Sequence, residues 1–99
     1  MGIFNKSEFG DVKGYLGKGA IVLDVRTDAE YEEGHVAGSK HIVLDYLPDH
    51  VNELKELNKP IITCCRSGAR SGRAEEFLAE HGVDVINGGP WENVDQFID

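Results

Sequence analysis

The stretch PIITCCRSGARSGR, residues 60–73, joins a short apolar run to a glycine-containing loop and the start of an amphipathic segment. Pro60–Cys64 is short and β-branched, which is typical of a buried strand. After the loop, Gly82 is well placed to end a helix. One face of that predicted helix carries Ala74, Phe77, Leu78 and His81. The stretch therefore predicts a strand, a loop and a helix in direct succession.

The rest of the chain repeats this alternation. Short apolar runs predict strands at Ala20–Val25, His41–Leu44 and Val83–Ile86, the last ended by Gly88-Gly89-Pro90. Helices are predicted around Val12–Leu16, Leu47–Leu57 and Trp91–Asp99, and an edge strand near Ile3-Phe4. Strands that alternate with helices indicate an α/β fold, with a mainly parallel sheet of about five strands joined by right-handed crossovers.

Length and charge narrow the class of protein. The 99 residues suit one domain, residues 1–99, and the 27 Leu, Ile, Val and Phe residues are too many for a disordered chain. The net charge of −8 argues against nucleic-acid and anionic-membrane partners, because phosphate groups repel such a surface. No apolar run approaches the ~18 residues of a membrane span, and the N-terminus does not resemble a secretory signal. A cytoplasmic protein is expected.

The two cysteines are neighbours, Cys64 and Cys65. Adjacent cysteines cannot tie distant loops together, so a disulfide scaffold is excluded. The chain has no Cys-x-x-Cys motif, and His41, His50 and His81 share no metal-ligand spacing. We therefore expect no metal site, and cysteines this sparse suggest chemistry more than architecture.

The segment from Cys64 to Arg73 has the properties of an anion site. It lies at the carboxyl end of a predicted parallel strand, where α/β proteins place their sites, and it enters a helix whose first N–H groups are unpaired. Gly68 lets the chain curl so that several N–H groups point inward. Three of the four arginines, Arg66, Arg70 and Arg73, fall here. Helix N-termini and nearby arginines lower the pKa of a thiol, so a cysteine at this loop should be a thiolate.

Either cysteine could serve as the nucleophile on spacing alone. Cys65 begins a Cys-x4-Arg loop that closes at Arg70, and Cys64 begins a Cys-x5-Arg loop that closes at the same arginine. Successive side chains of a strand point to opposite faces, so Cys64 should point into the core if Cys65 points toward the loop.

Four segments, taken in order, resemble the signatures of the rhodanese family of thiosulfate sulfurtransferases. Leu23-Asp24-Val25-Arg26, with Glu30-Tyr31, and Glu33 to Ser39 are similar to the two N-terminal signatures. Cys65-Arg66-Ser67-Gly68-Ala69-Arg70-Ser71 looks like the active-site loop, and Gly88-Gly89 with Trp91 resembles the C-terminal signature. The resemblance covers nearly the whole chain and suits a single rhodanese-like domain.

The resemblance implies that Cys65 is the catalytic nucleophile. It would take a sulfur from thiosulfate or another sulfane-sulfur donor, hold it as a persulfide, and pass it to cyanide or to a small-molecule or protein thiol. The implied substrate and anion-binding loop consists of Arg66, Ser67, Gly68, Ala69 and Arg70. No metal or organic cofactor is implied. Asp24 and Arg26 are interpreted as structural partners, His35 as a loop-bracing residue, and residues 28–33 as a solvated helix face.

Two other functions remain open from the sequence. The spacing Cys64-x5-Arg70 meets the loop pattern of cysteine-dependent phosphatases, some of which share the rhodanese fold, and of arsenate reductases. A non-catalytic binding module is the second alternative.

Overall fold

The computed structural model describes residues 9–98 and contains one sheet of four parallel strands in that range. The strands are β1 (Ile21–Asp24), β2 (Lys40–His41), β3 (Ile61–Cys65) and β4 (Val85–Pro90), in the spatial order β2-β1-β3-β4. The predicted parallel α/β fold is confirmed, and four of its predicted strands lie within residues 9–98. The edge strand expected near Ile3-Phe4 lies outside the described residues.

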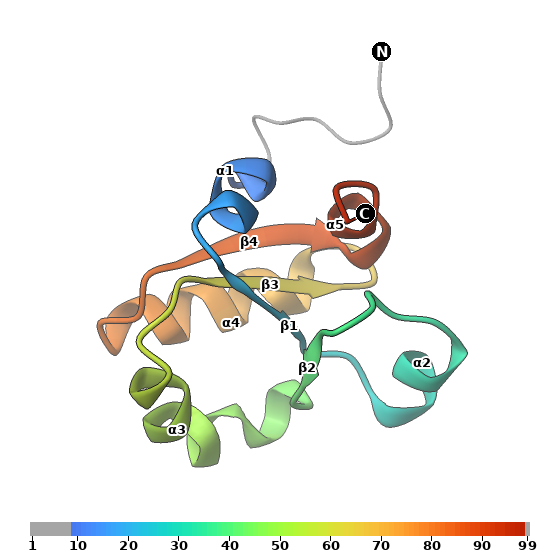
Figure 1. Cartoon of the computed structure of the whole chain (residues 1–99). Helices are drawn as coiled ribbons and strands as arrows, with labels where there is room; N and C mark the ends of the chain where they lie inside the picture. Colours follow the sequence, from blue (N-terminus) through green and yellow to red (C-terminus); the bar gives the residue numbers. More distant parts are fainter. Residues whose placement is uncertain (1–8, 99) are drawn as a thin grey trace.

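Helices cover both faces of the sheet (Figure 1). On one face lie α1 (Val12–Gly17) and α5 (Trp91–Asp95). On the other lie the 3-10 helix η1 (Leu44–His50), α3 (Val51–Glu56) and α4 (Ala69–Glu80). Each face has its own buried apolar cluster, because successive strand residues point in opposite directions. The short helix α2 (Asp28–Glu33) follows β1 at the carboxyl-terminal edge of the sheet.

The segment after β2 departs from the sequence prediction. The strand expected over His41–Leu44 ends at His41, and the helix expected through Leu47–Leu57 is divided into η1 and α3. Pro48 lies inside η1, where its missing N–H favours a short 3-10 segment over a continuous α-helix.

The last strand also departs from the prediction. Gly88-Gly89-Pro90 was expected to end it, but β4 begins at Val85 and runs through Pro90. The pairing of β4 with β3 shifts register between Thr63 and Cys65, opposite the two glycines, so this part of β4 is a bulge. Gly89 has φ +81, which explains the need for glycine there.

All four strands point the same way, so the segments that follow β1, β3 and β4 meet at one edge of the sheet (Figure 1). They are α2, the loop from Cys65 to Gly68, and α5. This edge is where an open parallel sheet places its binding site. No helix within residues 9–98 has the length and apolar character to cross a membrane.

Candidate active site

The Sγ atom of Cys65 lies at the end of β3, surrounded by hydrogen-bond donors. The N–H of Gly68 donates to it at 3.0 Å and the N–H of Ser71 at 3.4 Å, and the Ser71 hydroxyl lies 3.3 Å away. Gly68 adopts φ +103, which turns the chain so that α4 can begin at Ala69. We call Cys65, Gly68 and Ser71 together the sulfur cradle.

The environment of Cys65 favours the thiolate. Burial alone raises the pKa of its thiol, but the hydroxyl and N–H of Ser71 and the N–H groups of Gly68 and Ser67 outweigh burial, so the pKa lies below its usual value. Cys65 is 0% exposed, so these donors act where water does not compete with them. This is the electrostatic arrangement that a nucleophilic cysteine requires.

Cys64 has the opposite environment. Its side chain packs on the other face of the sheet, in the apolar cluster with Val22, Ile62 and Val94. Burial raises the pKa of its thiol, and the nearby Asp24 carboxylate raises it further. The predicted orientation of Cys64, into the core and away from the loop, is thus confirmed.

Arg70 is held by α2 across the edge of the sheet. Its Nη1 and Nη2 atoms donate to the two carboxylate oxygens of Glu30 at 2.7 and 2.9 Å. Thr27 forms a capping box with Glu30 at the start of α2, which fixes the carboxylate. Chiefly because of Arg70, the pKa of Glu30 falls to about 2. Arg70 therefore braces the loop, and Glu30 is not part of a purely solvated helix face as the sequence suggested.

Asp24 and Arg26 form a buried ion pair at the end of β1. Arg26 Nε lies 3.0 Å from both carboxylate oxygens of Asp24, and Nη2 lies 2.8 Å from Oδ2. The guanidinium also donates to the carbonyls of Glu30 and Gly34 at 3.2 and 2.7 Å. The predicted pairing of these two residues is confirmed, and the contacts of Arg26 with Glu30 and Gly34 also hold α2, which carries the carboxylate bound to Arg70.

The remaining loop residues face outward. Arg66, Ser67 and Ala69 are exposed. Arg66 lines a cavity of about 300 Å³ between the loop, α2 and α5. Its guanidinium takes part in none of the ion pairs formed between residues 9 and 98. The other residues lining the cavity are Arg26, Glu30, Glu33, Gly34, Trp91 and Glu92.

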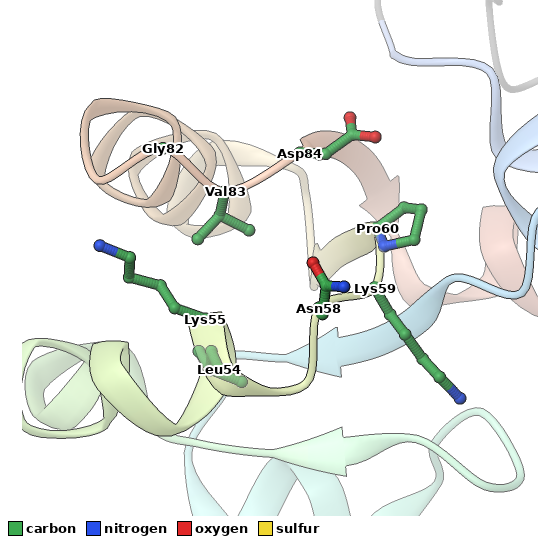
Figure 2. Close-up of a pocket in the computed structure, with 8 residues that line it drawn as sticks. All are labelled: Leu54, Lys55, Asn58, Lys59, Pro60, Gly82, Val83 and Asp84. Atoms are coloured by element: carbon green, nitrogen blue, oxygen red, sulfur yellow. The ribbon is translucent and has the colours of Figure 1, made fainter.

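A second cavity, of about 280 Å³, lies at the opposite edge of the sheet (Figure 2). It is formed where α3 leads into β3 and α4 leads into β4, and its lining includes Lys55, Lys59 and Asp84. It has no cysteine or histidine among its lining residues. The Cys65 thiol and the cavity lined by two arginines and three glutamates both lie at the carboxyl-terminal edge, which is therefore the candidate active site.

Three residues of this site were missed by the sequence analysis. Ser71 was quoted in the family motif but not interpreted as a ligand of sulfur, although its place in the first turn of the predicted helix could have indicated it. Glu30 lies 40 residues from Arg70, and Asn87 contacts Ser71 from β4. No local pattern links either of these pairs.

The chain is similar to proteins of one domain family. The family model of the rhodanese-like domain matches residues 8–90. Thiosulfate sulfurtransferase GlpE of Stutzerimonas stutzeri (strain A1501) is 33% identical over 68 residues, covering 69% of this chain and 62% of that protein. The uncharacterized protein YqhL of Bacillus subtilis (strain 168) is 38% identical over 67 residues, covering 68% of this chain and 52% of that protein. The chain thus spans less than two thirds of the length of these relatives.

A solved structure shows the same arrangement of elements. The crystal structure of a rhodanese-like domain protein from Staphylococcus aureus aligns with a TM-score of 0.68 at 30% identity. The alignment covers 76% of this chain and 74% of that chain.

Proposed function

The chain belongs to the rhodanese-like domain family, and from that premise we propose that it is a sulfurtransferase that carries a sulfane sulfur on Cys65. The observation that carries the proposal is the sulfur cradle, in which two backbone N–H groups and one hydroxyl surround a single buried Sγ atom. Relatives named as sulfurtransferases support the same reaction class.

In the first half-reaction, the Cys65 thiolate attacks the outer sulfur of thiosulfate. The sulfur–sulfur bond of thiosulfate breaks, and sulfite leaves with the bonding electron pair. Cys65 becomes a persulfide whose outer sulfur carries the negative charge. The N–H groups of Gly68 and Ser71 point at Sγ, so they stabilise the attacking thiolate before the new bond forms. Donors held in place before the reaction need no reorganisation during it.

In the second half-reaction, a thiophilic acceptor attacks the outer sulfur of the persulfide. The bond between this sulfur and Cys65 breaks, the thiolate is restored, and cyanide leaves as thiocyanate or a thiol leaves as a persulfide. The two halves form a ping-pong sequence with one covalent intermediate.

Arg66 is the loop arginine best placed to meet an anionic donor. It is exposed beside Cys65 and lines the cavity between α2 and α5, whereas the hydrogen bonds of Arg70 go to Glu30. We therefore assign donor contact to Arg66, and bracing of the cradle to Arg70. Ser67, Gly68 and Ala69 supply the turn of the loop between them.

The phosphatase and arsenate-reductase alternatives depend on Cys64, and the position of that residue argues against them. Cys64 is 0% exposed and packs in an apolar cluster on the face away from the loop. Burial favours its neutral thiol, which is a poor nucleophile. The loop from Cys65 to Arg70 is one residue shorter than a loop that begins at Cys64, and we expect it to accommodate one additional sulfur better than a tetrahedral phosphate.

An activity comparison tests the proposal against these alternatives. With thiosulfate and cyanide, we expect thiocyanate to form, and with para-nitrophenyl phosphate we expect no hydrolysis above the rate of the buffer. Both assays use the unaltered chain and the variant Cys64→Ser. Phosphate hydrolysis by the unaltered chain that disappears in Cys64→Ser would move the nucleophile to Cys64 and contradict the sulfurtransferase proposal.

A further inference from the structure

The side chain of Asn87 connects β4 to the sulfur cradle. Its Nδ2 donates to the carbonyl of Gly68 at 3.0 Å. Its Oδ1 accepts the hydroxyl of Ser71 at 2.7 Å and the N–H of Gly89 at 2.9 Å. One amide thus contacts two members of the cradle and the bulge of β4 that lies beside them.

Two backbone groups fix the orientation of this amide. The N–H of Gly89 can only donate and the carbonyl of Gly68 can only accept, so Oδ1 must face Gly89 and Nδ2 must face Gly68. A flipped amide would lose both hydrogen bonds. Oδ1 is therefore always presented to the hydroxyl of Ser71.

The hydroxyl of Ser71 has one hydrogen and two neighbours that can accept it. These are Oδ1 of Asn87 at 2.7 Å and Sγ of Cys65 at 3.3 Å. When Cys65 is a thiol, its S–H can donate to Ser71 while Ser71 donates to Asn87. When Cys65 is a thiolate, the hydroxyl can turn and donate to the sulfur. Oδ1 then keeps the N–H of Gly89, so the turn leaves no buried acceptor unpaired.

We propose that Asn87 is a positioning residue for sulfur transfer, which acts through Ser71 and Gly68. Its amide holds the Ser71 hydroxyl between two acceptors and ties down the carbonyl of Gly68, the residue whose N–H points at Cys65. The inference rests on the proposed function only in taking Cys65 as the reactive thiol.

Few charged groups in the described structure face Cys65. Arg70 on α4 is close enough to interact with a Cys65 thiolate, and Cys64 is its titratable neighbour on β3. The β4 residues from Asn87 to Pro90, which lie beside the loop, carry no charge. A carboxylate introduced at position 87 would therefore be a new charge beside the cradle.

The test variant is Asn87→Asp, made with Cys64→Ala so that Cys65 is the only thiol. A carboxylate at position 87 keeps the hydroxyl hydrogen of Ser71 directed to itself and away from the sulfur. It cannot donate a hydrogen bond to the carbonyl of Gly68, and its charge repels the Cys65 thiolate. We expect the pH profile of Cys65 alkylation by iodoacetamide to move upward by at least about one pH unit, a fall of about tenfold in rate at pH 6. The limiting rate at high pH should stay within about threefold of the parent, because Asp has the size and shape of Asn and leaves the route to the sulfur unchanged.

The matched control is Asn93→Asp in the same background. Asn87 is partly buried and Asn93 is buried. The Nδ2 of Asn93 donates to the carbonyl of Gly88 at 2.7 Å, but none of its hydrogen bonds reaches the sulfur cradle. We expect its alkylation profile to match the parent. An unchanged profile for Asn87→Asp, or the same upward shift for Asn93→Asp, would overturn the proposal.

A double variant separates action through Ser71 from a direct effect of charge. Ser71→Ala alone should slow alkylation at pH 6, because one donor to the thiolate is lost. Adding Asn87→Asp to Ser71→Ala should then have a clearly smaller effect than Asn87→Asp alone. If the fall in alkylation rate in the double variant equals the product of the falls in the two single variants, Asn87 does not act through the hydroxyl of Ser71.

A measurement on the unaltered chain covers the case in which Asn87→Asp fails to fold. The side-chain amide resonance of Asn87 in ¹⁵N NMR should titrate together with Cys65, and this response should disappear in Ser71→Ala. An amide resonance that stays fixed while Cys65 titrates would overturn the proposal. Neither readout uses a sulfur donor, so each remains interpretable even if the chain accepts no sulfur from thiosulfate.

Discussion

Replacing Cys65 by serine should lower the rate of thiocyanate formation by at least about a thousandfold, because a hydroxyl cannot form the persulfide on which both half-reactions depend. The change removes one sulfur atom from a buried position and leaves the donors of Gly68 and Ser71 in place. The variant should therefore remain folded while its activity disappears. The measurement is the rate of thiocyanate formation from thiosulfate and cyanide, with circular dichroism as the check on folding.

Cys64→Ala is the matched control for this prediction. Cys64 is equally buried, so its replacement also disturbs the core, but it packs on the opposite face of the sheet. Activity per folded molecule should stay within a few-fold of the unaltered chain. A folded Cys64→Ala variant without activity, together with an active Cys65→Ser variant, would exchange the roles of the two cysteines.

Asp24→Ala should destabilise the fold more than the loss of any exposed ion pair. The Asp24 side chain is 0% exposed and that of Arg26 is 5% exposed, so removing the carboxylate leaves a guanidinium buried without its counter-charge. Breaking a buried pair in this way costs about 3–5 kcal/mol. The measurement is the free energy of unfolding from urea titration, and Asp24→Asn, which keeps the size of the side chain, should show a similar loss.

Glu53→Ala is the control for this second prediction. Glu53 pairs with Lys40 at 3.4 Å and with His50 at 2.5 Å, and the side chain is 49% exposed. Solvent screens such a pair, so the free energy of unfolding should fall much less for Glu53→Ala than for Asp24→Ala. Equal losses for Asp24→Ala and Glu53→Ala would mean that Asp24–Arg26 does not behave as a buried ion pair.

The segments with strong local signals could be predicted from the sequence. The strand ending at the cysteines, the turn at Gly68 and the following helix depend on β-branched runs, a glycine at positive φ and helical spacing, all of which are local. The opposite orientations of Cys64 and Cys65 follow from the alternation of a strand.

The features that were not predicted depend on tertiary contacts. The course of β4 through Gly88 and Gly89 depends on a bulge against β3, which overrides the usual interpretation of paired glycines as the end of a strand. The bracing of Arg70 depends on Glu30, which only the folded sheet brings near. Asn87 contacts Ser71 across 16 residues, and no periodicity marks such a pair.

The most direct test of the account is the intact mass of the chain after incubation with thiosulfate and removal of the excess donor. The account predicts a gain of one sulfur atom per chain, reversed by cyanide, present in Cys64→Ala and absent in Cys65→Ser. No gain in the folded, reduced protein with thiosulfate or with a persulfide donor would contradict the persulfide mechanism and favour a non-catalytic binding module. A gain that persists in Cys65→Ser would contradict the assignment of the nucleophile.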